Sequence, residues 1–367
     1  MGAVDPTYPL YPIVAIISAV LLLLVFLSSF VRQSWNLGVT FLCFWLFFEN
    51  LTAAVNAIVW SDNADIKLYI YCDIVSHLQL IAYVVKPMST LLIMRRLYLI
   101  ANLRSVDCPG KSARRWDCCI EWTLGLIIPV LIAGPAYFVV QGSRFIVEEG
   151  IGCGYASVSS VVSLVLIDSW TVMAPLLSTV LYYPKVAMTL YRQSREFNCF
   201  LRSNRSISRT NYIRILALAS INIVIILTFN LTMILFEVLP LVDVHRTITL
   251  YNGWSNLHTD WSPLGFSWAD VKAGGKLNLA IQYLDQWASV AHSFAIFALF
   301  GLTVGARASY WRAICTVAGW FGWKPTWRGR SGATRSVLSS IRFNRNRQAQ
   351  EVSLASCEPL GYVHRSP

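Results

Sequence analysis

The chain has 367 residues, of which 56% are hydrophobic and 13% are charged, and its formal net charge at pH 7 is +11. Soluble domains carry about 25% charged residues, so the composition excludes an ordinary soluble globular protein. The basic excess does not indicate a nucleic-acid-binding protein, because the basic residues lie beside apolar stretches, where the anionic inner leaflet of a membrane is their physical partner.

Seven apolar stretches follow one another, and each is long enough to cross a hydrocarbon core about 30 Å thick as a helix. They are 10–31, 36–60, 69–94, 119–140, 158–184, 212–239 and 279–304. The sequence therefore predicts an all-α membrane protein in which residues 1–304 form a seven-transmembrane helix bundle. The first ten residues contain no Lys or Arg, so we expect the first stretch to be an uncleaved helix rather than a signal peptide.

Lys and Arg are distributed unevenly between these stretches. Alternate segments, beginning with the one after the first stretch, hold one, six, seven and ten of them, which is 24 of the 30 when Arg214, at the inner start of the sixth stretch, is counted with the seven. The segments on the other side hold five, and Lys86 falls within a stretch. Cytoplasmic loops carry the Lys/Arg excess, so we expect the N-terminus outside and the C-terminus inside.

Lys86 in the third stretch is predicted to pair with Glu49 in the second. An ionisable side chain at membrane depth is costly unless it has a partner or water. At a rise of about 1.5 Å per residue, Lys86 and Glu49 both lie roughly 10–20 Å from the inner ends of their helices. We therefore expect an ion pair or a water-bridged equivalent. It either specifies packing or acts as a switch that repacks on activation.

Other polar side chains within the stretches have two interpretations. Four amides are expected to make hydrogen bonds between helices: Asn50, Asn56, Asn222 and Asn230. His77, Asp168 and His292 either line a ligand cavity or are satisfied core residues. Prolines inside the stretches mark predicted bends, because a proline removes a backbone donor.

Only Cys72 and Cys153 of the nine cysteines are placed on the outer side or at its boundary. Two cysteines in an oxidising compartment permit one intramolecular pairing, which would tie the second external segment over the bundle. The alternative is two free thiols. On the inner side thiols stay reduced.

The external segment 240–278 is long and rich in Trp, Asn and Asp. It is either a lid or binding surface, or a variable mobile loop. After the seventh stretch, residues 305–327 form a predicted juxtamembrane amphipathic helix that lies against membrane lipids. Within it, Cys315 is a palmitoylation candidate. From 328 to 367 we expect a disordered cytoplasmic tail, whose serines are either phosphorylation sites or simply solvated.

Several seven-helix classes fit the sequence poorly. The stretch 279–304 has no lysine, which a retinal protein needs for its Schiff base. The five histidines form no cluster in the sequence of the kind a metalloenzyme uses, and no metal or other cofactor is predicted. A transporter is expected to show repeated halves, and no internal repeat is visible. A receptor accounts for the basic inner loops and the tied external segment.

The chain also resembles fungal mating-pheromone receptors of the lipopeptide (a-factor) type. The resemblance runs from about residue 32 to 310 and rests on spaced motifs: Asn50–Trp60, Tyr71–Ile74, Lys86–Ser89, Arg95–Tyr98, Ile151–Cys153 and Ser208–Ile215. The first internal loop departs from the family pattern, with only Asn36 and Gly38 clearly in place. No Asp-Arg-Tyr or Asn-Pro-x-x-Tyr switch of the large animal receptor class is present.

The resemblance implies a class D G-protein-coupled receptor of the plasma membrane, and not an enzyme. Its ligand would be a farnesylated peptide pheromone, with the prenyl chain in an apolar crevice and the peptide against the Trp-rich external segment. Candidate ligand contacts are His77, Asp168, Glu237, Trp254, Trp261, Trp268, Asp285 and His292. Residues expected to face a heterotrimeric G protein are Arg95, Arg96, Arg209 and Arg214. Homo-oligomers are left open, as are a receptor-like protein without a mating role and a seven-helix transporter.

Overall fold

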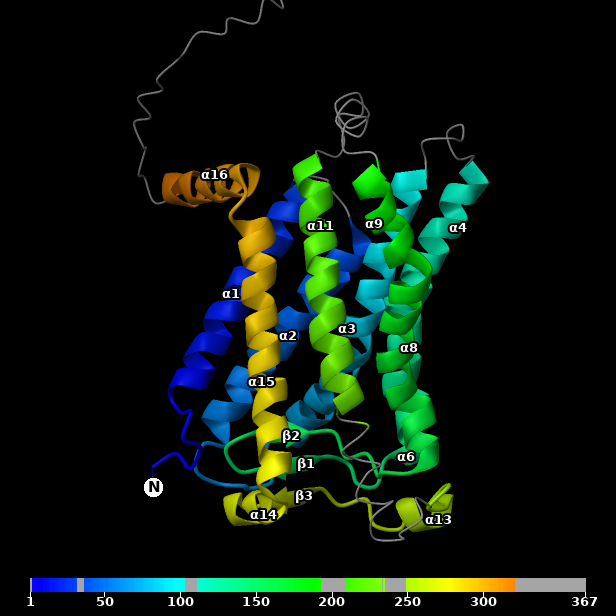
Figure 1. The fold of residues 1–367 in the computed structure, drawn as a ribbon. Helices are drawn as coiled ribbons and strands as arrows, with labels where there is room; N and C mark the ends of the chain where they lie inside the picture. Colours follow the sequence, from blue (N-terminus) through cyan, green and yellow to red (C-terminus); the bar gives the residue numbers. More distant parts are fainter. Residues whose placement is uncertain are drawn as a thin grey trace, which may run out of the picture.

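Long helices side by side make up most of the molecule in the computed structural model (Figure 1). The structure describes residues 2–31, 36–102, 111–192, 209–232, 234 and 249–320. The first three spans are single helices, α1 (Leu10–Val31), α2 (Leu37–Val59) and α3 (Tyr69–Asn102). Helices suit these apolar runs because they satisfy their own backbone hydrogen bonds in lipid.

The next three spans alternate α-helix with short π-helical turns. The fourth comprises α4 (Lys111–Trp122), η1 (Thr123–Ile127), α5 (Ile128–Leu131), η2 (Ile132–Ala136) and α6 (Tyr137–Val140). The fifth comprises α7 (Val161–Ser163), η3 (Leu164–Asp168), α8 (Ser169–Leu177), η4 (Ser178–Tyr182) and α9 (Tyr183–Arg192). The sixth comprises α11 (Arg209–Asn222) and η5 (Ile223–Leu227), with helix continuing to residue 232. Pro129 follows η1 and Pro135 lies in η2, where the wider turn relieves the clash that a proline ring makes in an α-helix.

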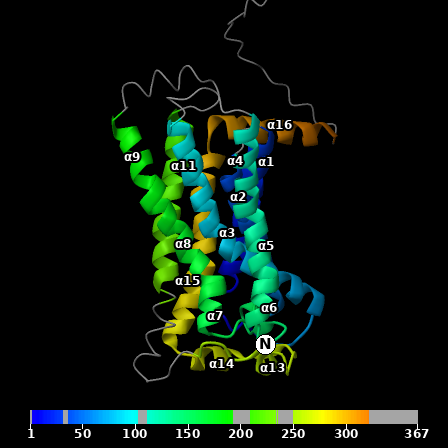
Figure 2. The same cartoon turned by 90° about the vertical axis from the view of Figure 1, so that its right-hand side faces the viewer.

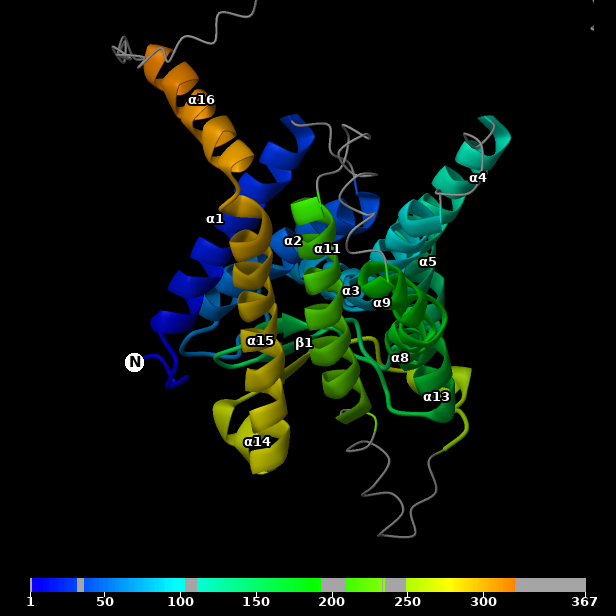
Figure 3. The same ribbon diagram turned by 45° about the horizontal axis from the view of Figure 1, so that its top comes forward.

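The seventh span is α15 (Lys276–Ile296) with η6 (Phe297–Gly301), followed by α16 (Val304–Trp320). Six described helices are long and apolar enough to cross a membrane, and α15–η6 passes the same test when joined to the start of α16, across a 93° bend. A polar stripe on α15 lowers its hydropathy. α16 lies across the end of the bundle and projects from it (Figures 1 and 3), as expected for an interfacial helix after the seventh span.

Segments between the helices form a small cover over the other end of the bundle, near the N-terminus (Figures 1 and 2). It contains β1 (Ile146–Glu148), β2 (Gly152–Gly154), β3 (Leu264–Phe266), α13 (Trp254–Leu257) and α14 (Trp268–Ala273). The strand order is β2-β1-β3, with β1 antiparallel to β2 and parallel to β3. The helical prediction did not contain this sheet. The described part of the long Trp-rich segment is therefore folded, and it joins the hairpin of the fourth-to-fifth connection.

Helix α3 lies at the centre and is the most buried span. One apolar cluster joins it to α1, α2, α9, α11 and α15, and a second joins it to η2, α6, η3 and α8. On α1, by contrast, large apolar side chains such as Ile13 and Val20 are exposed, as expected for a lipid-facing surface. Side chains that reach into the bundle from α3 are thereby placed in the middle of the fold.

Helix ends extend beyond the apolar stretches. α3 continues to Asn102 instead of ending near 94, α4 begins at Lys111 instead of 119, and α9 ends at Arg192 instead of 184. Apolar composition measures the hydrocarbon part of a span, while charged residues extend the helix into the interface. Glu237, the first internal loop at 32–35 and the tail 328–367 lie outside the described residues.

The predicted Cys72–Cys153 disulfide is confirmed, with Cα atoms 5.4 Å apart. It joins the first turn of α3 to β2. Both cysteines are buried in one cluster with Trp60, Phe145 and Val147, so the bond fixes the hairpin to an apolar platform.

Replacing both bridged cysteines, Cys72→Ser with Cys153→Ser, is expected to destabilise the folded protein. Removing a native disulfide typically lowers the free energy of unfolding by about 2–5 kcal/mol. We expect the lower half of that range, because the membrane already restricts α3 and the fourth span. Thermal unfolding in detergent measures the loss, with Cys118→Ser/Cys119→Ser on the exposed face of α4 as control. Equal midpoints for the two variants would mean that hydrogen bonds alone hold the hairpin.

Candidate functional site

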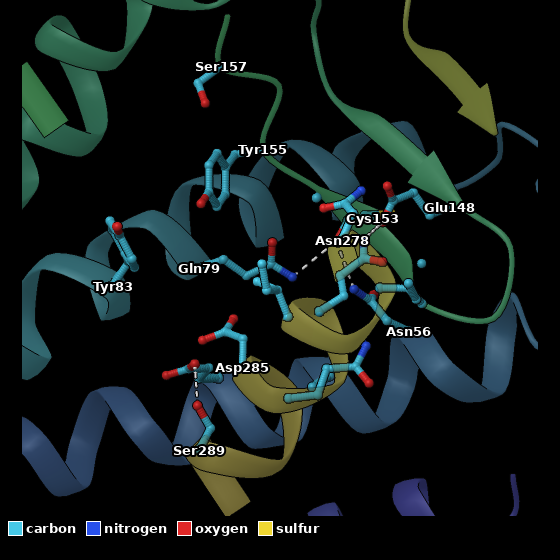
Figure 4. Close-up of a pocket in the computed structure, with 18 of the residues that line it drawn as sticks. Asn56, Gln79, Tyr83, Glu148, Cys153, Tyr155, Ser157, Asn278, Asp285 and Ser289 are labelled. Carbon is cyan, nitrogen blue, oxygen red and sulfur yellow. Dashed lines mark hydrogen bonds between the residues drawn. The ribbon is translucent and has the colours of Figure 1, made fainter. Parts of the chain in front are cut away.

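A cavity of about 590 Å³ opens beneath the sheet, between the helices (Figure 4). Its walls come from the sheet-proximal halves of α2, α3 and α15, from η3, and from the β1–β2 hairpin and the residues after it. Ligand pockets typically measure 300–1,000 Å³, so this space admits several residues of a peptide. A smaller cavity of about 30 Å³ shares Tyr83, Lys86 and Asp285 with it and reaches His292.

The floor of the cavity is a three-helix polar contact. The predicted pair forms, with Lys86 Nζ 2.9 Å from Glu49 Oε1. Ser289 of α15 donates to the same Glu49 oxygen at 2.6 Å and accepts from Lys86 at 3.4 Å. A buried charge needs both an opposite charge and hydrogen bonds. This contact supplies them and links α2, α3 and α15 at one level.

The hairpin roofs the cavity and is held by side chains from below. The carbonyl oxygen of Cys153 accepts hydrogen bonds from Asn56 Nδ2 at 2.9 Å and Gln79 Nε2 at 3.0 Å. Gly152 has φ +94°, and a Cβ there would lie 2.5 Å from Cβ of Asn56. Glycine thus allows the hairpin to lie directly on α2. Asn56 Oδ1 also accepts a hydrogen bond from Tyr71 Oη of α3 at 3.0 Å, which is the inter-helix hydrogen bond predicted for Asn56.

Three further carboxylates line the upper walls. Asp168 accepts a hydrogen bond from Tyr83 Oη at 3.0 Å, and Glu148 accepts one from Gln282 Nε2 at 2.5 Å. Asp285 lies within electrostatic reach of both Lys86 and Glu49. Burial raises the pKa of the Glu148 carboxyl above its ordinary value, and the Gln282 hydrogen bond opposes that shift. These carboxylates make the upper walls polar, while apolar side chains such as Ile167, Phe229 and Leu277 line other parts of the cavity.

Among the predicted ligand contacts, Asp168 and Asp285 line the large cavity and His292 lines the small one. The other described candidates lie elsewhere. His77 packs on Tyr137 with ring centroids 5.6 Å apart, and its Nδ1 lies 2.7 Å from the carbonyl oxygen of Asp73. It faces the fourth span because it projects from the opposite side of α3 to Lys86.

The tryptophans of the Trp-rich segment belong to the cover and do not line either cavity. Trp254 and Trp261 each stack on the ring of His258, at centroid distances of 4.0 and 5.2 Å, and both pack on Phe138 of α6. Trp268 is buried, and its backbone N donates to Glu149 Oε2 at 2.7 Å. Their contacts anchor the segment to the fourth span and the hairpin.

Several wall residues were missed from the sequence: Gln79, Tyr83, Glu148, Tyr155, Asn278, Gln282 and Gln286. A signal for most of them exists. Gln79, Tyr83 and Lys86 recur at helical spacing on one face of α3. Asn278, Gln282 and Ser289 follow the same spacing on α15. A search for polar stripes on apolar helices would have found both faces, whereas Glu148 lies in a hairpin without such periodicity.

The remaining intramembrane amides differ in their contacts. Asn50 Nδ2 donates to Ser293 Oγ of α15 at 3.0 Å, and Asn230 Nδ2 donates to the Thr171 carbonyl at 3.4 Å. Both are the inter-helix bonds that were predicted. The buried amide of Asn222 makes no hydrogen bond among the described residues, so the prediction of a bonded Asn222 is not met there.

Near the α16 end of the bundle, two predicted G-protein contacts are engaged within the chain. Arg95 pairs with Asp117 of α4, and Arg96 Nη1 lies 3.4 Å from Glu121 Oε1. Arg95 is largely buried rather than free on the surface, because α3 extends beyond the predicted end and meets α4. Arg214 lies on α11, half-buried, and the Arg209 side chain is outside the described residues. Cys315 is a free thiol on α16.

Comparison with known proteins gives one consistent family. The model of the Pheromone A receptor family matches residues 10–319. The Pheromone B alpha 3 receptor of Schizophyllum commune is 30% identical over 323 residues, covering 86% of this chain and 49% of that receptor.

Two further relatives have similar names. Pheromone receptor 2 of Mycosarcoma maydis is 27% identical over 298 residues, covering 80% of this chain and 83% of that receptor. The Pheromone a factor receptor of Saccharomyces cerevisiae is 24% identical over 282 residues, covering 75% of this chain and 55% of that receptor. The chain spans about half the length of the Schizophyllum commune receptors it matches.

The charge pair on the cavity floor generates a double-mutant test. Glu49→Gln or Lys86→Met alone leaves an uncompensated buried charge and is expected to cost about 3–5 kcal/mol. The double variant is expected to recover most of that loss, because neither charge then remains. Thermal unfolding and cell-surface expression measure the three variants, with Lys86→Arg as a control that keeps the cation. Strictly additive losses would contradict the pairing.

Proposed function

Because this chain belongs to the Pheromone A receptor family, we propose that it is a G-protein-coupled receptor for a prenylated peptide pheromone. The family is one of receptors rather than enzymes. The observation that carries the proposal is the polar cavity beneath a disulfide-tied cover at one end of the bundle. The basic ends of α3 and α11 lie at the other end, which suits a ligand on one face and a cytosolic partner on the opposite one.

The proposed orientation places the sheet outside a plasma membrane and α16 inside. Two independent arguments support it. Lys and Arg concentrate in the segments at the α16 end, which is the cytoplasmic pattern. The Cys72–Cys153 bond lies at the sheet end, and disulfides persist in oxidising compartments. Residues 1–304 would then be the receptor domain, 305–327 a juxtamembrane segment and 328–367 a cytoplasmic tail.

We propose that the peptide part of the pheromone occupies the cavity. Its contacts would include Asp168 and Asp285, with His292 in the smaller cavity beside them. Glu237 stays a proposed ligand contact outside the described residues, and the tryptophans would act by holding the cover in place. A hydrocarbon chain beside the carboxylates would strip them of hydration at high cost. We place the prenyl chain on apolar, lipid-facing helix surfaces instead, where each buried CH₂ still contributes about 0.8 kcal/mol.

On the cytosolic side, we propose that the ion pairs of Arg95 with Asp117 and of Arg96 with Glu121 hold the resting state. Binding in the cavity would repack the Glu49–Lys86–Ser289 contact, which α3 shares with these arginines. The arginines would then turn to the G protein together with Arg209 and Arg214. Such a ligand acts through its differential affinity for the two states. Palmitoylation at Cys315 would add a lipid anchor to α16.

Expression in a cell with a pheromone-responsive reporter tests the receptor function. We expect activation by a farnesylated, methyl-esterified peptide and a much weaker response to the same peptide without the prenyl group, because the lipid supplies most of the membrane affinity. Surface expression is measured in parallel. No response to any prenylated peptide at normal surface levels would favour a family member without a mating role. Substrate flux in receptor vesicles would favour a transporter instead.

Releasing the arginines is expected to raise signalling without ligand. Asp117→Asn with Glu121→Gln removes two pairs that each join a largely buried side chain to a part-exposed one. Even the value for an exposed pair, about 1 kcal/mol, would shift a two-state equilibrium about fivefold. The same reporter measures basal output against Asp65→Asn, an exposed acid at the sheet end. An unchanged or lower basal output would show that these pairs do not restrain the resting state.

A further inference from the structure

The large cavity carries an excess of negative charge. Its walls hold four carboxylates, from Glu49, Asp168, Asp285 and Glu148, against the single ammonium of Lys86. Lys86 is already engaged by Glu49 at 2.9 Å. The three other carboxylates therefore face a cavity that has no second cation among its described wall residues.

These three carboxylates differ in the hydrogen bonds and nearby charges that the protein offers them. Asp168 and Glu148 accept hydrogen bonds from a tyrosine hydroxyl and a glutamine amide, which are neutral donors and leave the charge in place. Asp285 makes no hydrogen bond or ion pair with another described residue and only senses Lys86 and Glu49 at longer range. Its carboxylate points into the space near Gln79 and Tyr83 in Figure 4. Of these three carboxylates, Asp285 is therefore the one that neighbouring protein groups satisfy least, and it is the best placed to pair with a cation.

Wall atoms that lack a hydrogen-bond partner also favour a ligand group that donates hydrogen bonds. Four wall residues carry a buried side-chain atom without a partner in the described structure, and every such atom is an acceptor: Glu49 Oε2, Asn50 Oδ1, Gln282 Oε1 and Gln286 Oε1. Two of these amides are fixed in orientation. The Asn50 nitrogen donates to the Leu46 carbonyl, and the Gln282 nitrogen donates to Glu148, so their oxygens cannot exchange places with the nitrogens. Asn50 is 1% exposed.

We propose that this cavity binds a cationic, donor-rich group of the ligand, a guanidinium or an ammonium, with Asp285 as its principal counter-ion and Glu148 of the hairpin as a second one. The proposal rests on the receptor function proposed above and names the chemistry that its cavity selects. A cavity with four carboxylates and one ammonium disfavours carboxylate and phosphate ligands, because each would be placed beside like charge. It also disfavours a hydrocarbon chain, which satisfies no acceptor.

Cation binding there would act directly on the cavity floor. A ligand cation at Asp285 neutralises the field that Asp285 exerts on Lys86 and adds a like charge near the Lys86 ammonium. Both effects favour movement of Lys86 relative to Ser289 and Glu49, which lie on different helices. Ligand charge would thereby be converted into a change of packing between α2, α3 and α15.

Thermal stabilisation of the purified full chain in detergent tests the proposal with two probes that differ only in charge. N-acetyl-arginine amide carries the guanidinium, and N-acetyl-citrulline amide is its neutral isostere. We expect saturable stabilisation by the arginine probe at millimolar concentration and an affinity for the citrulline probe at least about tenfold weaker, because a charge-assisted hydrogen bond is lost. Asp285→Asn and Glu148→Gln should each weaken arginine binding, and Asp65→Asn should not.

Equal stabilisation by the two probes, or no stabilisation by either, would overturn the proposal. So would equal arginine affinity in Asp285→Asn and Asp65→Asn. If Asp285→Asn fails to fold, Glu148→Gln and the probe pair on the unmodified chain still decide the matter. Failure of the receptor function is a separate result: it appears as silence of the reporter with every prenylated peptide, while selective arginine binding by the purified chain remains.

Discussion

The ion pair between Lys86 and Glu49 is the constraint around which the bundle is organised. Two charges at membrane depth are tolerated only if they meet, so α2 and α3 must lie antiparallel with these residues at one level. Ser289 then brings α15 to the same point. One polar contact thus fixes the axial positions of these three helices relative to one another. The helices form most of the cavity wall, and the cavity lies directly above the contact.

The cover completes the site by a different kind of interaction. The disulfide, the apolar platform around Trp60 and the hydrogen bonds to the Cys153 carbonyl hold the hairpin over the helices. The folded part of the Trp-rich segment pairs with that hairpin through β3 and is anchored by stacked aromatic rings. Negative charge is concentrated beneath the hairpin because the elements that carry Asp168, Asp285 and Glu148 meet at this cavity. The result is a cavity with more carboxylates than cations in its described walls.

Much of the fold followed from periodicity and charge. Apolar stretches located the spans, and counting the rise per residue paired Lys86 with Glu49. The same reasoning misplaced helix ends, because it cannot see charged turns that continue a helix beyond the hydrocarbon. It also treated Arg95 and Arg96 as free loop residues, since their carboxylate partners lie on α4, far along the chain. His77 and the tryptophans were offered as ligand contacts by residue type, yet their contacts are with neighbouring helices and the cover.

The sequence by itself determined the membrane class, the number of spans, the possible cysteine pairing and the buried charge pair, because each depends on local composition or on helical rise. Only the tertiary structure decided which side chains share a space. The excess of carboxylates in the cavity arises from residues on α2, η3, β1 and α15, which no local pattern connects. Their proximity depends on how the helices pack and on where the hairpin is tied, and these are long-range contacts.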